Sequence, residues 1–138
     1  MGFLKPDWMN KKNEKKALMA VERENSQSIL AEIRVNAPLK IVRDLANNKY
    51  MSNLVEIAKN SDDYILLEET IKELSKNLNG LLEVAKNTKH TYAGVLAIKI
   101  LADNNMQSMI IDIAQHAKNN DVRSKAVEKI TDQNLLFL

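Results

Sequence analysis

The sequence of 138 residues contains no cysteine. This absence excludes disulfide bonds, a thiolate nucleophile, cysteine-ligated zinc and the usual cysteine-ligated iron–sulfur clusters. Only 2 prolines and 3 glycines occur, and aromatic residues make up 4% of the chain, which leaves little material for a turn-rich β architecture. Because 45% of the residues are hydrophobic, the chain can still bury a core, and an all-α fold is predicted.

A large charge of one sign and long hydrophobic runs are also missing. The 20 basic and 18 acidic side chains give a net charge of +2, which is too small for the whole protein to attract nucleic acid or an anionic membrane. The most apolar stretch, residues 92–102, is interrupted by Lys99 and is too short to cross a bilayer. The first residues lack a signal-peptide core, and Pro6 breaks the myristoylation pattern. We therefore expect a cytoplasmic protein that does not bind a membrane.

One short pattern occurs four times: an aliphatic residue, an apolar residue, an acid and a second aliphatic residue. The copies end at intervals of 24, 27 and 29 residues. Self-similarity at such a period predicts a stack of similar helical units. The copies are residues 30–33 (Leu-Ala-Glu-Ile), 54–57 (Leu-Val-Glu-Ile), 81–84 (Leu-Leu-Glu-Val) and 110–113 (Ile-Ile-Asp-Ile).

Around these copies, apolar residues at i, i+3 and i+4 alternate with short polar breaks, which is typical of antiparallel helical hairpins. We predict one all-α domain over residues 1–138, an α-solenoid of about five hairpins, with residues 1–11 as a cap segment. A break at Asn47-Asn48 shortens the second hairpin. The repeats are expected at residues 12–36, 37–61, 62–88, 89–120 and 121–138. The first helices are expected at 12–24, 38–46, 64–74, 92–102 and 122–130, and the second at 27–35, 50–59, 78–86, 106–118 and 133–138.

The tripeptide Ala-Lys-Asn occurs at residues 58–60, 85–87 and 117–119, each time where a second helix is expected to end. Lysine complements the negative end of a helix, and asparagine tolerates the left-handed conformation that closes one. Helix ending is therefore the favoured interpretation. A basic stripe that binds phosphate groups is the alternative.

Residues 121–130 (Asp-Val-Arg-Ser-Lys-Ala-Val-Glu-Lys-Ile) resemble the first helix of HEAT-like bacterial α-helical repeats, Asp-Val-Arg-x-x-Ala-x-x-x-Leu, with Ile130 in the leucine position. Val42-Arg43 matches half of this motif. Leucine-rich-repeat variants and armadillo-like proteins are close relatives, although the cysteine cluster that such variants can carry is missing. The resemblance covers roughly residues 12–138. It implies a superhelix that binds proteins, or less often nucleic acids, on its curved surface.

Groups that could support catalysis or metal binding are few. Gly2, Gly80 and Gly94 form neither a phosphate-binding loop nor a dinucleotide fingerprint. His90 and His116 have no partner at a metal-ligand spacing. We expect structural or exposed roles for both histidines.

Two pairs of adjacent acids, Asp62-Asp63 and Glu68-Glu69, are compatible with acid–base chemistry. The first pair precedes an expected helix, where acids favour the positive helix end. The side chains of the second pair point about 100° apart on a helix. We therefore expect no catalytic residue, no metal site and no cofactor, and a protein that is not an enzyme.

The acids of the repeated pattern are the best candidate for a binding surface. If the second helices line one face of the stack, these acids recur at the same angular position and form an acidic row, which could bind a basic peptide or helix of a protein partner. The alternative is a solvated surface with i, i+3 pairs on its own helices, such as Glu56 with Lys59. The acidic row consists of Glu32, Glu56, Glu83 and Asp112.

A basic cluster near Trp8 is the opposing candidate. Its lysines could bind phosphate groups beside an aromatic ring, as in a nucleic-acid-binding protein. Trp8 is more simply explained as a cover for the apolar end of the first repeat. The cluster consists of Lys11, Lys12, Lys15 and Lys16.

The sequence finishes on four apolar residues where earlier units continue into a second helix. An exposed apolar edge of this kind predicts end-to-end self-association or contact with a partner. The four residues are Leu135, Leu136, Phe137 and Leu138.

The function that these features favour is a non-enzymatic scaffold for protein–protein interaction. A nucleic-acid-binding protein and a regulatory or inhibitory subunit are the alternatives.

Overall fold

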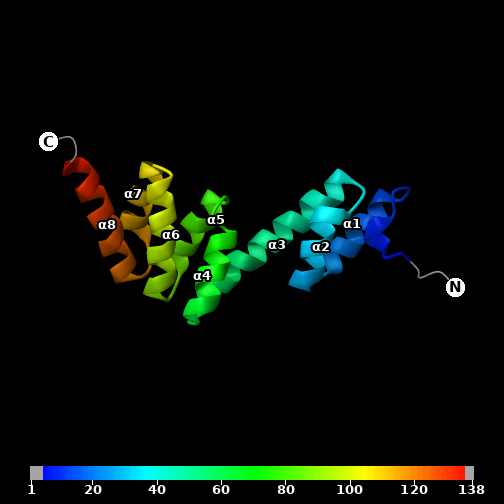
Figure 1. The fold of residues 1–138 in the computed structure, drawn as a ribbon, viewed down its shortest axis with the longest axis horizontal. Coiled ribbons are helices and arrows are strands. Elements are labelled where there is room, and N and C mark those ends of the chain that lie inside the picture. Colours follow the sequence, from blue (N-terminus) through cyan, green and yellow to red (C-terminus); the bar gives the residue numbers. More distant parts are fainter. Residues whose placement is uncertain (1–4, 136–138) are drawn as a thin grey trace. The chain divides into compact units, whose positions relative to one another are not determined.

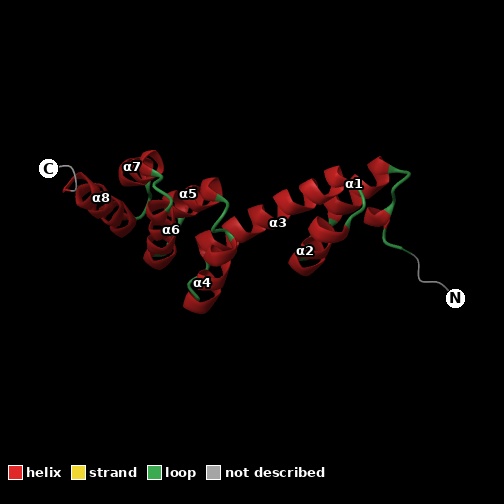
Figure 2. Ribbon diagram, turned by 45° about the horizontal axis from the view of Figure 1, so that its top comes forward, coloured by secondary structure: helices red, strands yellow, loops and turns green. Residues whose placement is uncertain are grey.

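The computed structural model describes residues 5–135, with side chains up to residue 131. These residues form eight α-helices, one short 3-10 helix and no strand, which confirms the all-α prediction (Figures 1 and 2). None of these helices has both the length and the apolar character needed to cross a membrane. The elements are η1 Asp7–Met9, α1 Glu14–Arg23, α2 Gln27–Asn36, α3 Lys40–Asn60, α4 Tyr64–Glu73, α5 Leu78–Asn87, α6 Thr91–Asp103, α7 Gln107–His116 and α8 Asn120–Leu135.

Two compact units divide the chain, residues 1–53 and residues 54–138. The boundary falls inside α3, so this helix contributes residues to both units. In the first unit η1 packs on α1, and Trp8 is only 8% exposed. This burial agrees with the predicted role of Trp8 as a cover for apolar surface. The core of this unit also contains Ala17, Val21, Leu30, Ile33, Ala37, Val42 and Ala46.

The predicted break at Asn47-Asn48 was wrong, because α3 is continuous from Lys40 to Asn60. Asparagine is only about 0.7 kcal/mol less favourable than alanine inside a helix. No proline or glycine occurs within α3, so nothing in the sequence enforces a break. Contacts with the preceding helices then determine that the helix continues.

Lys49 provides three of these contacts. Its ammonium donates hydrogen bonds to the carbonyl oxygens of Val21 (2.8 Å), Glu22 (2.8 Å) and Glu24 (2.7 Å). The last carbonyls of a helix lack intrahelical partners. Lys49 therefore provides hydrogen-bond donors for the carbonyl oxygens at the C-terminal end of α1.

Helix α2 supplies a second set of polar contacts to the middle of α3. The Arg34 guanidinium lies 4.1 Å from the centroid of the Tyr50 ring and donates from Nη1 to Asn47 Oδ1 (3.2 Å). Gln27 donates to the Tyr50 carbonyl (3.2 Å) and accepts from Asn53 Nδ2 (2.7 Å). Of the two asparagines that suggested a break, Asn47 is thus a partner of α2.

Helix α6 is at the centre of the second unit. It packs against α4, α5, α7 and α8, and α5 also contacts α7. Its buried face includes the small residues Ala93, Gly94 and Ala97, which allow close approach of neighbouring helices. The core of this unit also contains Leu67, Ile71, Leu74, Leu81, Val84, Ile98, Leu101, Ile110, Ile113, Val122 and Ala126.

Two of the three Ala-Lys-Asn copies end helices as predicted. Asn60 and Asn87 are the last residues of α3 and α5, and their side-chain amides donate to the carbonyls of Glu56 (2.8 Å) and Glu83 (3.0 Å). The expected left-handed conformation is not used, since Asn105 is the single non-glycine residue of the described chain with a positive φ (58°).

The third copy was interpreted wrongly, because it lies in the turn after α7. Its asparagine, Asn119, begins a helix instead of ending one. Asn119 Oδ1 accepts from the backbone N–H groups of Asp121 (2.8 Å) and Val122 (3.1 Å) at the start of α8. This is the usual role of an asparagine at a helix N-terminus.

The two arginines of the repeated Val-Arg pair make equivalent local contacts. Each guanidinium donates from Nη1 to two carbonyls in the turn that precedes its own helix. The two positions of the motif thus have the same structural role. The bonds are Arg43 to Ala37 (2.7 Å) and Pro38 (3.1 Å), and Arg123 to Ala117 (2.5 Å) and Lys118 (3.4 Å).

Candidate functional site

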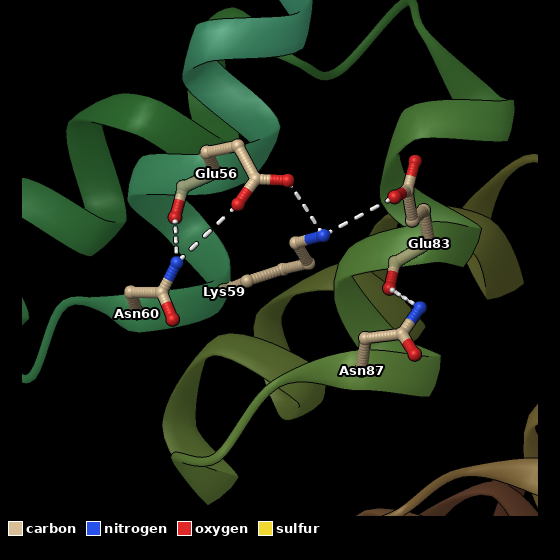
Figure 3. Close-up of polar contacts among 5 residues, drawn as sticks. All are labelled: Glu56, Lys59, Asn60, Glu83 and Asn87. Carbon is tan, nitrogen blue, oxygen red and sulfur yellow. Dashed lines mark hydrogen bonds and ion pairs between the residues drawn. The ribbon is translucent and has the colours of Figure 1, made fainter.

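Lys59 joins two members of the acidic row. Its ammonium lies 2.7 Å from Glu56 Oε1 on its own helix and 3.2 Å from Glu83 Oε1 on α5 (Figure 3). The hydrogen bond to Glu56 is the main cause that raises the pKa of Lys59, and Glu83 adds to the effect. The side chain is 17% exposed. Lys59 therefore compensates the charge of one of the two carboxylates.

The same relationship recurs one helix pair further along. The Lys86 ammonium, on α5, lies 3.1 Å from Asp112 Oδ1 on α7. Asp112 also contacts His116 Nδ1 (2.9 Å). The hydrogen bond from Lys86, with that from His116, lowers the pKa of Asp112 below its usual value of 3.8.

Backbone hydrogen bonds reinforce both contacts. The Lys59 carbonyl accepts from the N–H of Lys89 (3.4 Å), and the Lys86 carbonyl accepts from the N–H of Lys118 (2.9 Å). Each lysine thus holds the next helix pair with its carbonyl and with its ammonium. Three acids of the predicted row are brought into this system of contacts, where their carboxylates stabilise the packing of successive helices.

The fourth acid of the row is isolated. Glu32 is exposed in the unit of residues 1–53 and forms no hydrogen bond or ion pair with any described side chain. The residue at the position of the pairing lysine, three residues later, is Val35, which is 67% exposed. The lysine contact therefore has no counterpart at Glu32.

The lysines of the N-terminal basic cluster are exposed. Lys16 forms a long ion pair with Asp7 (3.7 Å), while the ammonium groups of Lys11, Lys12 and Lys15 have no partner among the described residues. A shallow hollow of about 270 Å³ lies beside the cluster, lined in part by Asp7, Lys15, Lys16 and Arg23. The charged residues that line the hollow give it a net positive charge.

The side chains of one acid of the pair Asp62-Asp63 and of one of the two histidines have local partners. Asp63 Oδ1 accepts from the N–H groups of Ile65 (3.0 Å) and Leu66 (3.1 Å) and begins α4, as its position predicts. His116 is on the surface beside Asp112. Across the part of the chain that the structure describes, no three acidic or histidine side chains are grouped so that they could hold a metal ion.

An exposed apolar surface at the start of α4 was missed by sequence reasoning. Tyr64, Ile65 and Leu66 are 65%, 71% and 40% exposed. The Tyr64 ring meets the Tyr92 ring of α6 edge to face, with centroids 4.8 Å apart. We call Tyr64, Ile65 and Tyr92 the tyrosine patch. Consecutive apolar residues in the first turn of a helix, directly after its capping acid, were the available signal.

Glu68 is hydrogen-bonded to one residue of the tyrosine patch, Tyr92. It lies one helical turn after Tyr64 and accepts a hydrogen bond from the Tyr92 hydroxyl. This bond is the main cause that raises the pKa of Tyr92, because ionisation would place a negative charge beside the carboxylate. The two tyrosine rings and the carboxylate therefore form one ordered surface.

The predicted self-association surface lies beyond the described side chains. The side chain of Leu135 and all of Leu136, Phe137 and Leu138 lie outside the described residues. The end-to-end contact stays a prediction.

Comparison with known proteins gives no relative from which a function could be transferred. No protein-family model matches the chain, and neither the curated proteins nor the solved structures that were searched contain a significant match.

Proposed function

We propose that this protein is a non-enzymatic helical-repeat scaffold, similar to HEAT-like α-solenoids, that binds another protein through the tyrosine patch. The observation that carries the proposal is the run of three exposed apolar side chains, Tyr64, Ile65 and Leu66, the first of which packs edge to face against the half-buried Tyr92 ring. Runs of exposed apolar residues are unusual unless they serve a function, and tyrosine is enriched at the energetic centres of protein interfaces.

The repeated contacts support the scaffold part of the proposal. Lys59 and Lys86 hold successive helix pairs in the same way, and Arg43 and Arg123 occupy equivalent turns. Repeat proteins derive their stability from such nearest-neighbour contacts and present extended binding surfaces. The acidic row is a less favoured binding surface, since a ligand would compete with Lys59 and Lys86 for its carboxylates.

The experiment is an affinity capture from the source cell's lysate at low and moderate salt, with and without nuclease. The bait proteins are the wild type, Ile65→Ser and Val127→Ser. Val127 is a matched control because it is an exposed aliphatic residue (51%) in the same unit, on α8. We expect a discrete protein that survives nuclease treatment, is retained by Val127→Ser and is lost by Ile65→Ser. Equal capture by the two variants would contradict the proposal.

Nucleic-acid binding is the second candidate function. Three exposed lysines without described ion-pair partners favour it, and one of them, Lys15, lines the hollow. In that case nuclease would remove the captured material. Replacing Lys12 and Lys15 by glutamate would weaken binding and make its salt dependence shallower, because fewer counterions would be released.

A further inference from the structure

Building on the proposed function, we propose that the tyrosine patch binds a basic amphipathic segment of the partner protein. Aliphatic side chains of that segment pack on Tyr64, Ile65 and Tyr92, and its arginine or lysine side chains bind the carboxylates of Glu68 and Glu69. The charge around the patch, its geometry and its contrast with the acidic row all support this partner chemistry.

The charge around the patch is strongly acidic. Residues 61–73 carry five carboxylates and one lysine, whereas the whole chain has a net charge of +2. Asp62, Glu68 and Glu69 form no ion pair with any described residue. A partner with basic side chains would therefore find carboxylates with which no lysine or arginine of the described chain forms an ion pair.

The acidic row differs in this respect. Glu56 and Glu83 share Lys59, and Asp112 is paired with Lys86. A basic ligand at the row would have to displace these lysines and disrupt the packing of successive helices. At the tyrosine patch it would break no ion pair, and Glu68 uses only Oε1 in its hydrogen bond with Tyr92.

The spacing along α4 suits an amphipathic ligand. Side chains at i and i+4 share a helix face, so Glu68 lies one turn after Tyr64 and Glu69 lies one turn after Ile65. The apolar side chains and the carboxylates thus form two adjacent bands on one surface. The tyrosine rings add a favourable interaction with a guanidinium or ammonium group placed over their faces.

The test uses the full chain and a displayed random peptide library. The library peptides are about 16 residues long, roughly four helical turns. Clones that bind the wild type are counter-selected against Tyr64→Ser/Ile65→Ser, so that only patch-dependent peptides are retained. We expect enrichment of net positive peptides that combine arginine or lysine with spaced aliphatic residues. No patch-dependent peptide, or enrichment of neutral or acidic peptides, would overturn the partner chemistry.

Charge variants then test the contact with the carboxylates. For a selected peptide we expect the Kd of Glu68→Gln/Glu69→Gln to be roughly fivefold weaker than that of the wild type at low salt, with the difference reduced at high salt. The glutamine at position 68 can still accept the Tyr92 hydrogen bond. The matched control is Glu22→Gln/Asp103→Asn, which removes two exposed carboxylates without described partners elsewhere and should bind like the wild type.

The two proposals fail in distinguishable ways. If Ile65→Ser loses the natural partner but the selected peptides are not basic, the protein-binding function stands and the partner chemistry is wrong. Identical binding by Glu68→Gln/Glu69→Gln and the wild type also contradicts the partner chemistry. If Ile65→Ser captures the partner normally, the proposed function itself is wrong.

Discussion

A Cβ atom added to Gly94 on α6 would lie only 2.4 Å from Cγ2 of Val122 on α8. Real side chains essentially never approach so closely, so the absence of a side chain at position 94 determines how near α8 can pack. Val122 belongs to the Val-Arg pair of the HEAT-like motif and is fully buried. The glycine and the motif residue are therefore complementary in shape.

We expect Gly94→Ala to destabilise the protein by about 1–3 kcal/mol, even though alanine is the better helix former, because valine is stiff and the core would be overpacked. Val122→Ala alone should cost roughly 2 kcal/mol through the cavity it leaves. The double variant should be more stable than the sum of the two effects predicts. Urea denaturation of the four proteins measures this coupling, and strict additivity would contradict the close packing.

Lys49 provides a second test, on the continuity of α3. Its ammonium bonds three carbonyls at the end of α1. Lys49→Met should remove the donor from the carbonyls of Glu22 and Glu24, while that of Val21 keeps the Glu24 N–H, and should cost about 1–3 kcal/mol. Lys40→Met is the matched control. Lys40 lies in the same helix, and its side chain is 79% exposed with one i, i+4 partner, Asp44, so its loss should change stability by less than about 0.5 kcal/mol. Equal losses in the two variants would contradict the capping role.

The helices themselves could largely be predicted from apolar spacing. Leu30, Leu54, Leu81 and Ile110, the first residues of the repeated pattern, are all buried, because a helix with such spacing has one face to pack. The continuity of α3 could not be predicted, since it depends on Lys49 and Arg34 reaching across to other helices. Local helix propensity does not contain that information.

The surface was harder to predict than the core. Glu56 pairs with Lys59 on its own helix, as the i, i+3 spacing indicates. The pairing of Glu83 and Asp112 with the lysine of the preceding helix pair, in contrast, needs the spatial neighbour. Likewise, Tyr64 and Ile65 have the same apolar character as buried helix residues, and only their 65% and 71% exposure distinguishes them. A pattern of residue types defines a helix face, whereas exposure depends on what packs against it.

The contact between Lys86 and Asp112 predicts a pH dependence. The folded-state pKa of Asp112 is lowered below 3.8, so the carboxylate contributes stability above its unfolded pKa and loses it as the pH falls through the folded pKa. We expect Asp112→Asn to lower the free energy of unfolding by about 0.5 kcal/mol near neutral pH, given the partial exposure of the pair. The difference from the wild type should shrink as the pH falls below the usual value of 3.8 and through the lowered pKa of Asp112.

Glu32→Gln is the control for the pH measurement, because Glu32 has no partner among the described residues. Chemical denaturation at several pH values should show no pH-dependent difference between this variant and the wild type. A difference for Asp112→Asn that persists unchanged at acid pH would contradict an ionic contribution and indicate a packing effect instead.

The equivalent arginines give the last prediction, which concerns the repeat itself. Arg43 and Arg123 each donate to two carbonyls in the turn before their own helix, so Arg43→Met and Arg123→Met should each cost about 1–2 kcal/mol through the loss of charged hydrogen bonds. Hydrogen exchange should accelerate in the first turns of α3 and of α8, respectively, because each contact is local. Arg23→Met, an exposed arginine without a described partner, should leave both regions unchanged. If only one of the two motif variants is affected, the positions are not structurally equivalent, and the similarity of the two Val-Arg pairs is a coincidence of sequence.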